Sequence, residues 1–282
     1  MMLNENYFSD FLFGKSEETV LTYRRVLLRF CAWLTRNEQT INEITRFDLQ
    51  EYITYCQEVK KYNPDTLRKD FAGIRSYLVF LGKESVLNGV RLPKSQKLLV
   101  TPKSLDRNER NRLLRAVEKD QNVRNIAIMY LLYETGIRAH ELIQLDREDV
   151  QFNYHASQSR LIVRSGKGGK YRIVPFPKES NAKHWLAEYL KTRQDQINAL
   201  FLSNYHQRLS QRSLNRILQH YGVHPHLLRH TMLSQLARNG VDMATLASIA
   251  GHSDLKTTKI YTMPQFEDIQ QAMNRAFLDD SY

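Results

Sequence analysis

The chain lacks long apolar runs and has very few cysteines. No stretch approaches the roughly 18 apolar residues of a membrane span, and the first five residues, MMLNE, lack the basic start and apolar stretch of a signal peptide. Cys31 and Cys56 are the only cysteines, each inside an amphipathic pattern, so buried free thiols are expected in place of a disulfide framework. These absences argue against a membrane-spanning or disulfide-stapled protein and favour a cytoplasmic one.

Internal repeats and nucleotide-binding signatures are also missing. The glycine-rich segment 166–169 (GKGG) does not fit the GxxxxGK[ST] pattern of a phosphate-binding loop. What the chain has in excess is positive charge, with a formal net charge of +11. This charge favours an anionic partner, most often nucleic acid, with a membrane surface as the rival.

The distribution of charge and periodicity predicts two domains. Residues 1–90 carry equal numbers of basic and acidic side chains, 12 of each, and their apolar residues recur at helical spacing, which predicts an all-α unit. Periodicity is lost over residues 91–104, which contain two prolines and four basic residues and are predicted to be a linker. Residues 105–282 form the second predicted domain. The excess positive charge lies on the linker and this second domain.

The second domain is predicted to be mixed α/β within a mainly α protein. Residues 126–133 are apolar nearly all round, as in a core helix that ends at Thr135-Gly136, so Arg138 is displayed at a turn beside the core. Alternating or β-branched segments predict a small antiparallel sheet, with 166–169 as a tight turn. The predicted strands are residues 149–153, 160–165 and 170–176.

Residues 226–261 hold an unusual density of titratable side chains. His226, Arg229 and His230 stand at i, i+3 and i+4, so they share one face of the first turn of a predicted helix. A second helix, 241–250, is predicted to end at Gly251, and a third to carry Tyr261. Several helix ends could therefore bring these polar side chains together.

Each of these residues taken alone has an ordinary structural explanation. An arginine at a helix start, such as Arg138, is more often a surface or ion-pair residue. Lys167 resembles any charged hairpin tip, a lone histidine is more often a capping or core residue, and Tyr261 is one of 15 tyrosines. Only their combination and order point to a function.

That combination resembles the tyrosine recombinase, or phage integrase, family. The matching order is Thr-Gly-x-Arg at 135–138, a hairpin lysine, His-x-x-Arg at 226–229, Gly-His at 251–252, and a tyrosine nine residues after that histidine. Specific matches occur in HLLRH, LARNG, GHSDLKTTKIY and GKGGKYRIVP. The resemblance covers residues 105–282, and the N-terminal helical unit fits the family's core-binding domain more loosely. It implies a catalytic set of Arg138, Lys167, His226, Arg229, His252 and Tyr261.

The resemblance also implies a role for each member. Two arginines hold the phosphate oxygens, as suits planar guanidiniums that keep their protons. Tyr261 is the nucleophile, and Lys167 protonates the leaving oxygen. His226 serves as base and phosphate contact, and His252 as a hydrogen-bond donor. Glu141 matches an acidic position of the family and is expected to support the catalytic residues without contacting the DNA. His230 matches a frequent family residue and is left outside the catalytic set.

The implied reaction joins the protein to a 3′ phosphate, frees a 5′ hydroxyl, and needs no metal or other cofactor. Four protomers would exchange strands of duplex DNA through a Holliday junction. A C-terminal helix with an apolar stripe of Phe266, Ile269, Met273 and Phe277 is expected to dock into a neighbouring protomer. Chromosome or plasmid dimer resolution, transposon cointegrate resolution and integration of a mobile element all stay open.

Two alternatives from other classes compete with this interpretation. The first is a catalytically silent DNA-binding relative, against which the complete residue set argues. The second is a metallohydrolase that would use the clustered histidines His224, His226, His230 and His252. One departure from the family is Met263, where a histidine often follows the nucleophile by two residues.

Overall fold

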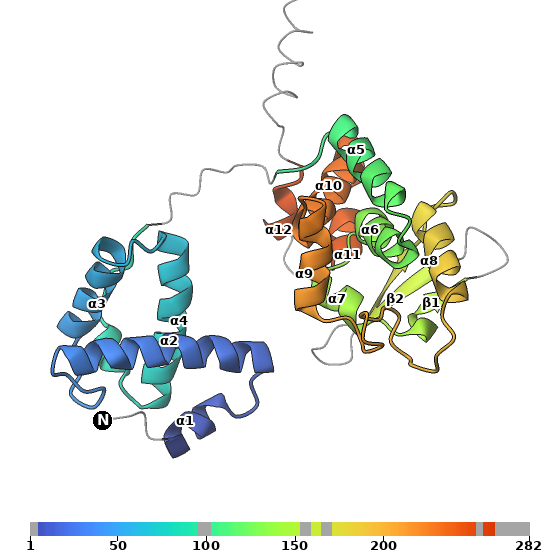
Figure 1. Ribbon diagram of the computed structural model, residues 1–282. Helices are drawn as coiled ribbons and strands as arrows, with labels where there is room; N and C mark the ends of the chain where they lie inside the picture. The colour runs from blue at the N-terminus through green and yellow to red at the C-terminus, as the bar shows by residue number, and fades with distance from the viewer. Residues whose placement is uncertain (1–4, 95–102, 153–158, 165–170, 252–255, 263–282) are drawn as a thin grey trace, which may run out of the picture. The chain divides into compact units, whose positions relative to one another are not determined.

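The computed structural model describes residues 5–94, 103–152, 159–164, 171–251 and 256–262. The chain divides into two compact units, Met1–Leu98 and Leu99–Tyr282 (Figure 1). The mainly α fold with one small antiparallel sheet confirms the predicted fold class. No helix within these described ranges is long and apolar enough to cross a bilayer.

The N-terminal unit is entirely helical in its described part. Its elements are α1 (Glu5–Leu12), α2 (Glu17–Arg36), α3 (Arg46–Glu58), α4 (Pro64–Phe80) and the 3-10 helix η1 (Glu84–Leu87). Side-chain caps begin the three long helices, because Ser16, Thr45 and Asn63 each accept a hydrogen bond from a backbone N–H of the first turn. The predicted helical character of this unit is confirmed.

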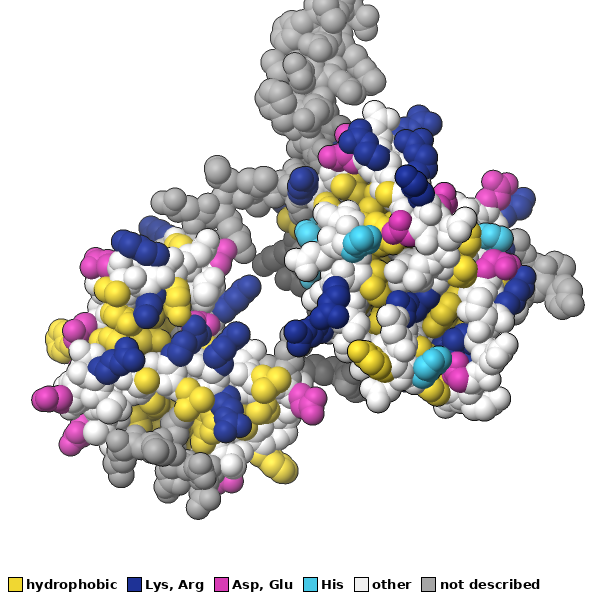
Figure 2. Space-filling model, in the orientation of Figure 1, with side chains coloured by type: hydrophobic (Ala, Val, Ile, Leu, Met, Phe, Trp, Pro, Cys, Tyr) yellow, Lys and Arg dark blue, Asp and Glu magenta, His cyan; other side chains and the backbone are white. Residues whose placement is uncertain are grey.

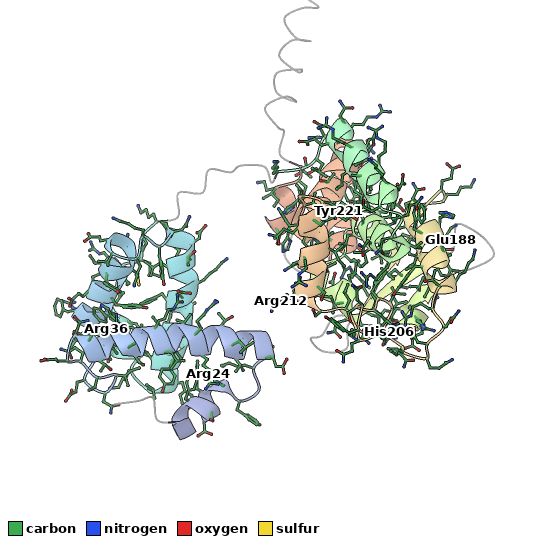
Figure 3. The ribbon with its side chains drawn as sticks, in the orientation of Figure 1. Arg24, Arg36, Glu188, His206, Arg212 and Tyr221 are labelled. Carbon is green, nitrogen blue, oxygen red and sulfur yellow. The ribbon has the colours of Figure 1, made fainter. Side chains whose placement is uncertain are left out.

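The core of this unit lies between α2, α3 and α4 and contains Phe30, Leu49 and Ile53, all essentially inaccessible to solvent. Arg24 and Arg36 of α2 are exposed (Figure 3). Figure 2 shows Lys and Arg side chains spread over the viewed face of this helical unit. Both cysteines are free; Cys56 is buried as predicted, but Cys31 is only partly buried.

The C-terminal unit packs its helices around α6. Its helices are α5 (Arg107–Lys119), α6 (Val123–Thr135), α7 (Ala139–Gln144), η2 (Arg147–Asp149), α8 (Asn181–Lys191), α9 (Gln211–His220), α10 (Pro225–Arg238), α11 (Met243–Ala250) and α12 (Lys256–Lys259). Helix α6 is buried on nearly every side and contacts α5, α8 and α10, which confirms the predicted core helix. Arg212 of α9 is exposed on the surface of this unit (Figure 3).

The three predicted strands form one antiparallel sheet in the order β1-β2-β3. Strand β1 spans Val150–Gln151, β2 spans Arg160–Arg164 and β3 spans Tyr171–Pro175. Val150 pairs with Leu161, which in turn pairs with Val174, and these three side chains enter the core. The predicted turn at 166–169 lies outside the described residues.

The prediction that Tyr261 lies on a helix was wrong. Helix α12 ends at Lys259, and Tyr261 follows in a turn whose backbone N–H donates to the carbonyl of Thr258. The departure from the helix allows the tyrosine ring to pack in a small cluster with Met232, Leu233 and Leu246. Burial of this ring therefore overrides continuation of the short helix.

Gly136 ends α6 in the left-handed conformation, with φ of 59°. A Cβ added there would overlap the terminal methyl of Met232 on α10. Glycine is required for the backbone conformation, and an added Cβ would also force the flexible end of the Met232 side chain to move aside. This turn sets the position of Arg138, two residues later.

We predict that Gly136→Ala costs about 2 to 3 kcal/mol of unfolding free energy, from left-handed strain plus the displacement of the Met232 side chain. Gly222→Ala is the matched control, because Gly222 also has positive φ (70°) but no atom within 4 Å of an added Cβ. It should cost about 1 to 2 kcal/mol. Urea unfolding followed by Trp185 fluorescence in a Trp33→Phe background measures both. Equal losses would contradict the packing argument.

Candidate active site

Arg138 occupies the N-cap of α7, with an extended backbone (φ −75°, ψ 153°). Its backbone N–H donates to Oε2 of Glu141 at 2.7 Å, and its Nη1 donates to Oε1 at 3.0 Å. Its Nη2 donates to the carbonyl of Gly251 at 2.9 Å, and the side chain stays 28% exposed. The guanidinium is therefore fixed on two sides while remaining accessible to a ligand.

Glu141 is 4% exposed and binds a second guanidinium, that of Arg172 on β3. Nη1 and Nη2 of Arg172 donate to Oε1 and Oε2 of Glu141 at 2.6 and 2.8 Å. Burial alone would raise the pKa of Glu141, but hydrogen bonds from Arg172 and from the Arg138 backbone outweigh it and lower the pKa to about 2. Glu141 is thus a carboxylate at every physiological pH.

Arg229 projects from α10 and is 3% exposed. Its Nη1 donates to the carbonyl of Gly136 and its Nη2 to the carbonyl of Ala250, both at 2.5 Å. Burial, together with the positive charge of Arg138, lowers the pKa of Arg229 to about 10. The guanidinium is still protonated at neutral pH and is held rigidly by the ends of two helices.

The C-terminal end of α11 is where the three arginines meet. Gly251 caps this helix in the left-handed conformation, which leaves the last carbonyls without helical partners. Guanidiniums fill consecutive positions there: Arg172 Nε donates to Ile249 (3.3 Å), Arg229 to Ala250 and Arg138 to Gly251. The negative end of the helix dipole also favours cations at this point.

Tyr261 lies beside this centre and is 6% exposed. Its hydroxyl is 2.6 Å from Nδ1 of His230. His230 lies one helical turn after His226 on α10, and the centroids of the two imidazole rings are 6.2 Å apart. Burial raises the pKa of Tyr261, opposed by the positive charges of Arg229 and Arg138. The hydroxyl is therefore protonated at rest but already close to positive charge.

The two histidines are held in their neutral form. Burial, then the charges of His226 and Arg229, lowers the pKa of His230 to about 4. His226 lies at the surface, but desolvation by its neighbours and the charge of Arg229 also lower its pKa. Both imidazoles can accept a proton or a hydrogen bond at neutral pH.

Five sequence-predicted residues thus have described positions: Arg138, Glu141, His226, Arg229 and Tyr261. Arg138, Glu141 and Arg229 form one group around the α11 terminus. Tyr261 lies next to this group and packs against α10, where its hydroxyl contacts His230. The predicted positions of Lys167 and His252 lie outside the described residues, as does the C-terminal helix expected after residue 262.

Sequence reasoning missed Arg172 and left His230 outside the catalytic set. Arg172 alternates with apolar residues in YRIVP, a pattern that favours an exposed strand face. The only available signal was a basic residue within a segment that already matched the family. His230 carried a stronger signal, because it shares a helix face with His226 and Arg229.

No three His, Cys, Asp or Glu side chains in the described ranges cluster closely enough to hold a metal ion. His224, one of the histidines of the metallohydrolase alternative, caps α10 by accepting a hydrogen bond from the backbone N–H of Leu227. His230 contacts Tyr261. These contacts give two of the four histidines other partners.

Comparison with known proteins agrees with this geometry. Residues 103–268 match the model of the Phage integrase family, and residues 6–85 match the Phage integrase, N-terminal SAM-like domain. Tyrosine recombinase XerA of Pyrococcus furiosus is 32% identical over 274 residues, covering 94% of this chain and 90% of XerA. TnP I resolvase of Bacillus thuringiensis is 29% identical over 273 residues, covering 92% and 94%.

Among solved structures, the post-cleavage complex of XerH site-specific recombinase bound to palindromic difH substrate superimposes with a TM-score of 0.71. Its identity is 19%, with 93% of this chain and 80% of that chain covered, so it shows similarity of fold. The chain belongs to the phage integrase family of tyrosine recombinases. As a member, it is a site-specific recombinase, an enzyme that cuts and rejoins DNA.

The lowered pKa of His230 predicts a pH-dependent stability. The pKa in the folded state, about 4, is below the ordinary value of 6.5, so the stabilisation is complete above pH 6.5 and is lost as pH falls towards 4. Urea unfolding at pH 7.5 and 5.0 should show that wild type loses about 2 kcal/mol more than His230→Gln. His184→Gln, at an exposed histidine, should follow wild type. Equal losses in His230→Gln and wild type would refute the argument.

Proposed function

We propose that this recombinase cleaves one strand of duplex DNA at a time by attack of Tyr261 on a phosphodiester held by Arg138 and Arg229. The observation that carries this proposal is the convergence of both guanidiniums on the end of α11, next to the buried tyrosine. Arg138 has exposed surface with which to meet an anion.

The charge of the site supports a phosphate as its ligand. Three guanidiniums and one carboxylate meet at the α11 terminus, which leaves a net positive charge. In the transition state of phosphoryl transfer, negative charge spreads over the phosphate oxygens, and preorganised donors stabilise it without further rearrangement. The carbonyls and Glu141 supply that preorganisation here, because they fix the arginines before substrate arrives.

In the proposed reaction the Tyr261 oxygen bonds to phosphorus and the bond from phosphorus to the 5′ oxygen breaks. The phenolic proton passes to a neutral imidazole; His226 is the proposed base, and His230 is the imidazole that contacts the hydroxyl at rest. Lys167 gives a proton to the departing 5′ oxygen, and His252 donates a hydrogen bond to the phosphate. These last two roles follow from the family resemblance.

Because the phosphotyrosyl bond replaces the phosphodiester bond, the free 5′ hydroxyl of a partner strand can reverse the step. The proposed chemistry therefore uses neither ATP nor a metal ion. Exchange of two strand pairs passes through a Holliday junction in a tetramer of this chain acting in the cytoplasm. Similarity to both tyrosine recombinase XerA and TnP I resolvase supports resolution of DNA dimers or cointegrates, with integration as the alternative.

The nucleophile can be tested with a nicked suicide substrate, from which the cleaved end is lost so that the covalent adduct accumulates. Wild type should form a protein–DNA adduct that persists in EDTA, and Tyr261→Phe should form none, because no phenol is left to attack. Tyr205→Phe, at an exposed tyrosine, should retain adduct formation. An adduct from Tyr261→Phe would disprove the assignment, and none from wild type would favour the catalytically silent alternative.

Tetramer formation can be tested by deleting residues 265–282, which carry the apolar stripe proposed to dock into a neighbouring protomer. The truncated chain should stay folded but lose cooperative assembly on a two-site DNA, measured as the slope of bound fraction against protein concentration. A polar variant of the stripe, Phe266→Ser with Phe277→Ser, should behave in the same way. Unchanged cooperativity in both would contradict the proposal.

A further inference from the structure

Glu141 is in contact with two arginines, and their contacts are unequal. Arg172 makes a bidentate pair, with one Nη on each carboxylate oxygen, whereas the Arg138 side chain contributes a single Nη. The remaining Arg138 contact to Glu141 comes from its backbone N–H. Both oxygens of the buried carboxylate therefore accept two hydrogen bonds each.

Because Arg172 makes the bidentate pair with Glu141, the Arg138 guanidinium keeps hydrogen-bonding capacity for other partners. A buried carboxylate and an arginine three residues away would favour a bidentate pair, which is among the strongest hydrogen-bonded ion pairs in proteins. Arg172 occupies the geometry that such a pair would need. Arg138 instead donates a hydrogen bond from its second Nη to the carbonyl of Gly251 and stays partly exposed.

Arg172 is itself fixed from the opposite side. Its Nε donates to Ile249, and its guanidinium lies against Gly251 so closely that an added Cβ there would be 2.8 Å from Nη1. Only 16% of the side chain is exposed. Strand β3, the end of α11 and the start of α7 are thereby locked together through one side chain.

We infer that Arg172 is a positioning residue for the recombination reaction, which neutralises Glu141 so that the charge of Arg138 stays available to the scissile phosphate. This inference rests on the proposed phosphate-binding role of Arg138. Without Arg172, Arg138 turns onto Glu141 and the phosphate loses one of its two clamps.

The inference predicts an unusual relation between two substitutions. Arg172→Gln should slow single-turnover cleavage of the nicked substrate at saturating DNA by about 10²-fold, the usual effect of losing one transition-state donor. Adding Glu141→Gln should recover about fivefold or more, a barrier change of about 1 kcal/mol, because the neutral amide no longer captures Arg138. Arg160→Gln, at an exposed arginine on the neighbouring strand, should stay within about twofold of wild type.

If the double variant cleaves as slowly as Arg172→Gln, or more slowly, Arg172 only supports the fold. If Arg172→Gln cleaves within about threefold of the wild-type rate, Arg172 has no role in the reaction. If Arg172→Gln fails to fold, Arg172→Lys permits the same comparison, because lysine keeps the charge but cannot fill both oxygens. A wild type that forms no Tyr261-dependent adduct would instead overturn the proposed function.

Discussion

The catalytic domain depends on the C-terminal end of one short helix, α11. Three consecutive carbonyls there each accept a hydrogen bond from a different arginine, and each arginine comes from a different element. Helix ends leave carbonyls unsatisfied, and their partial negative charge attracts cations. Arginines from β3, α7 and α10 make these hydrogen bonds together, so the geometry of the three guanidiniums is fixed by backbone groups that side-chain motion cannot displace.

Grouping three positive charges is costly unless negative groups compensate. Glu141 provides one full charge and the helix end provides partial charges, while burial of Arg229 still lowers its pKa to about 10. The excess of positive charge that remains is what an entering phosphate would neutralise. The same charges act on Tyr261. Burial raises the pKa of its hydroxyl, and the positive charges of Arg229 and Arg138 oppose that rise. In the proposed reaction, phosphate binding and activation of Tyr261 would therefore depend on one set of charges.

Much of this arrangement could be predicted from sequence because its signals are local. Arg138 follows a glycine cap, and His226, Arg229 and His230 share a helix face, so spacing alone indicated their display. Arg172 could not be found in this way, because its partner Glu141 is distant along the chain and periodicity carries no information on such pairs. The turn at Tyr261 was also missed, since the packing of its ring against α10 and α11 decides where α12 ends.

A crystal structure of a DNA complex would show whether the carbonyl end of α11 positions two arginines around a scissile phosphate beside Tyr261. The complex would contain the recombinase, a nicked DNA site with a free 5′ hydroxyl, and vanadate in place of the phosphate. We expect vanadate within hydrogen-bonding distance of Arg138 and Arg229 and bonded to the Tyr261 oxygen. Vanadate bound away from these arginines, or bonded to another residue, would contradict it.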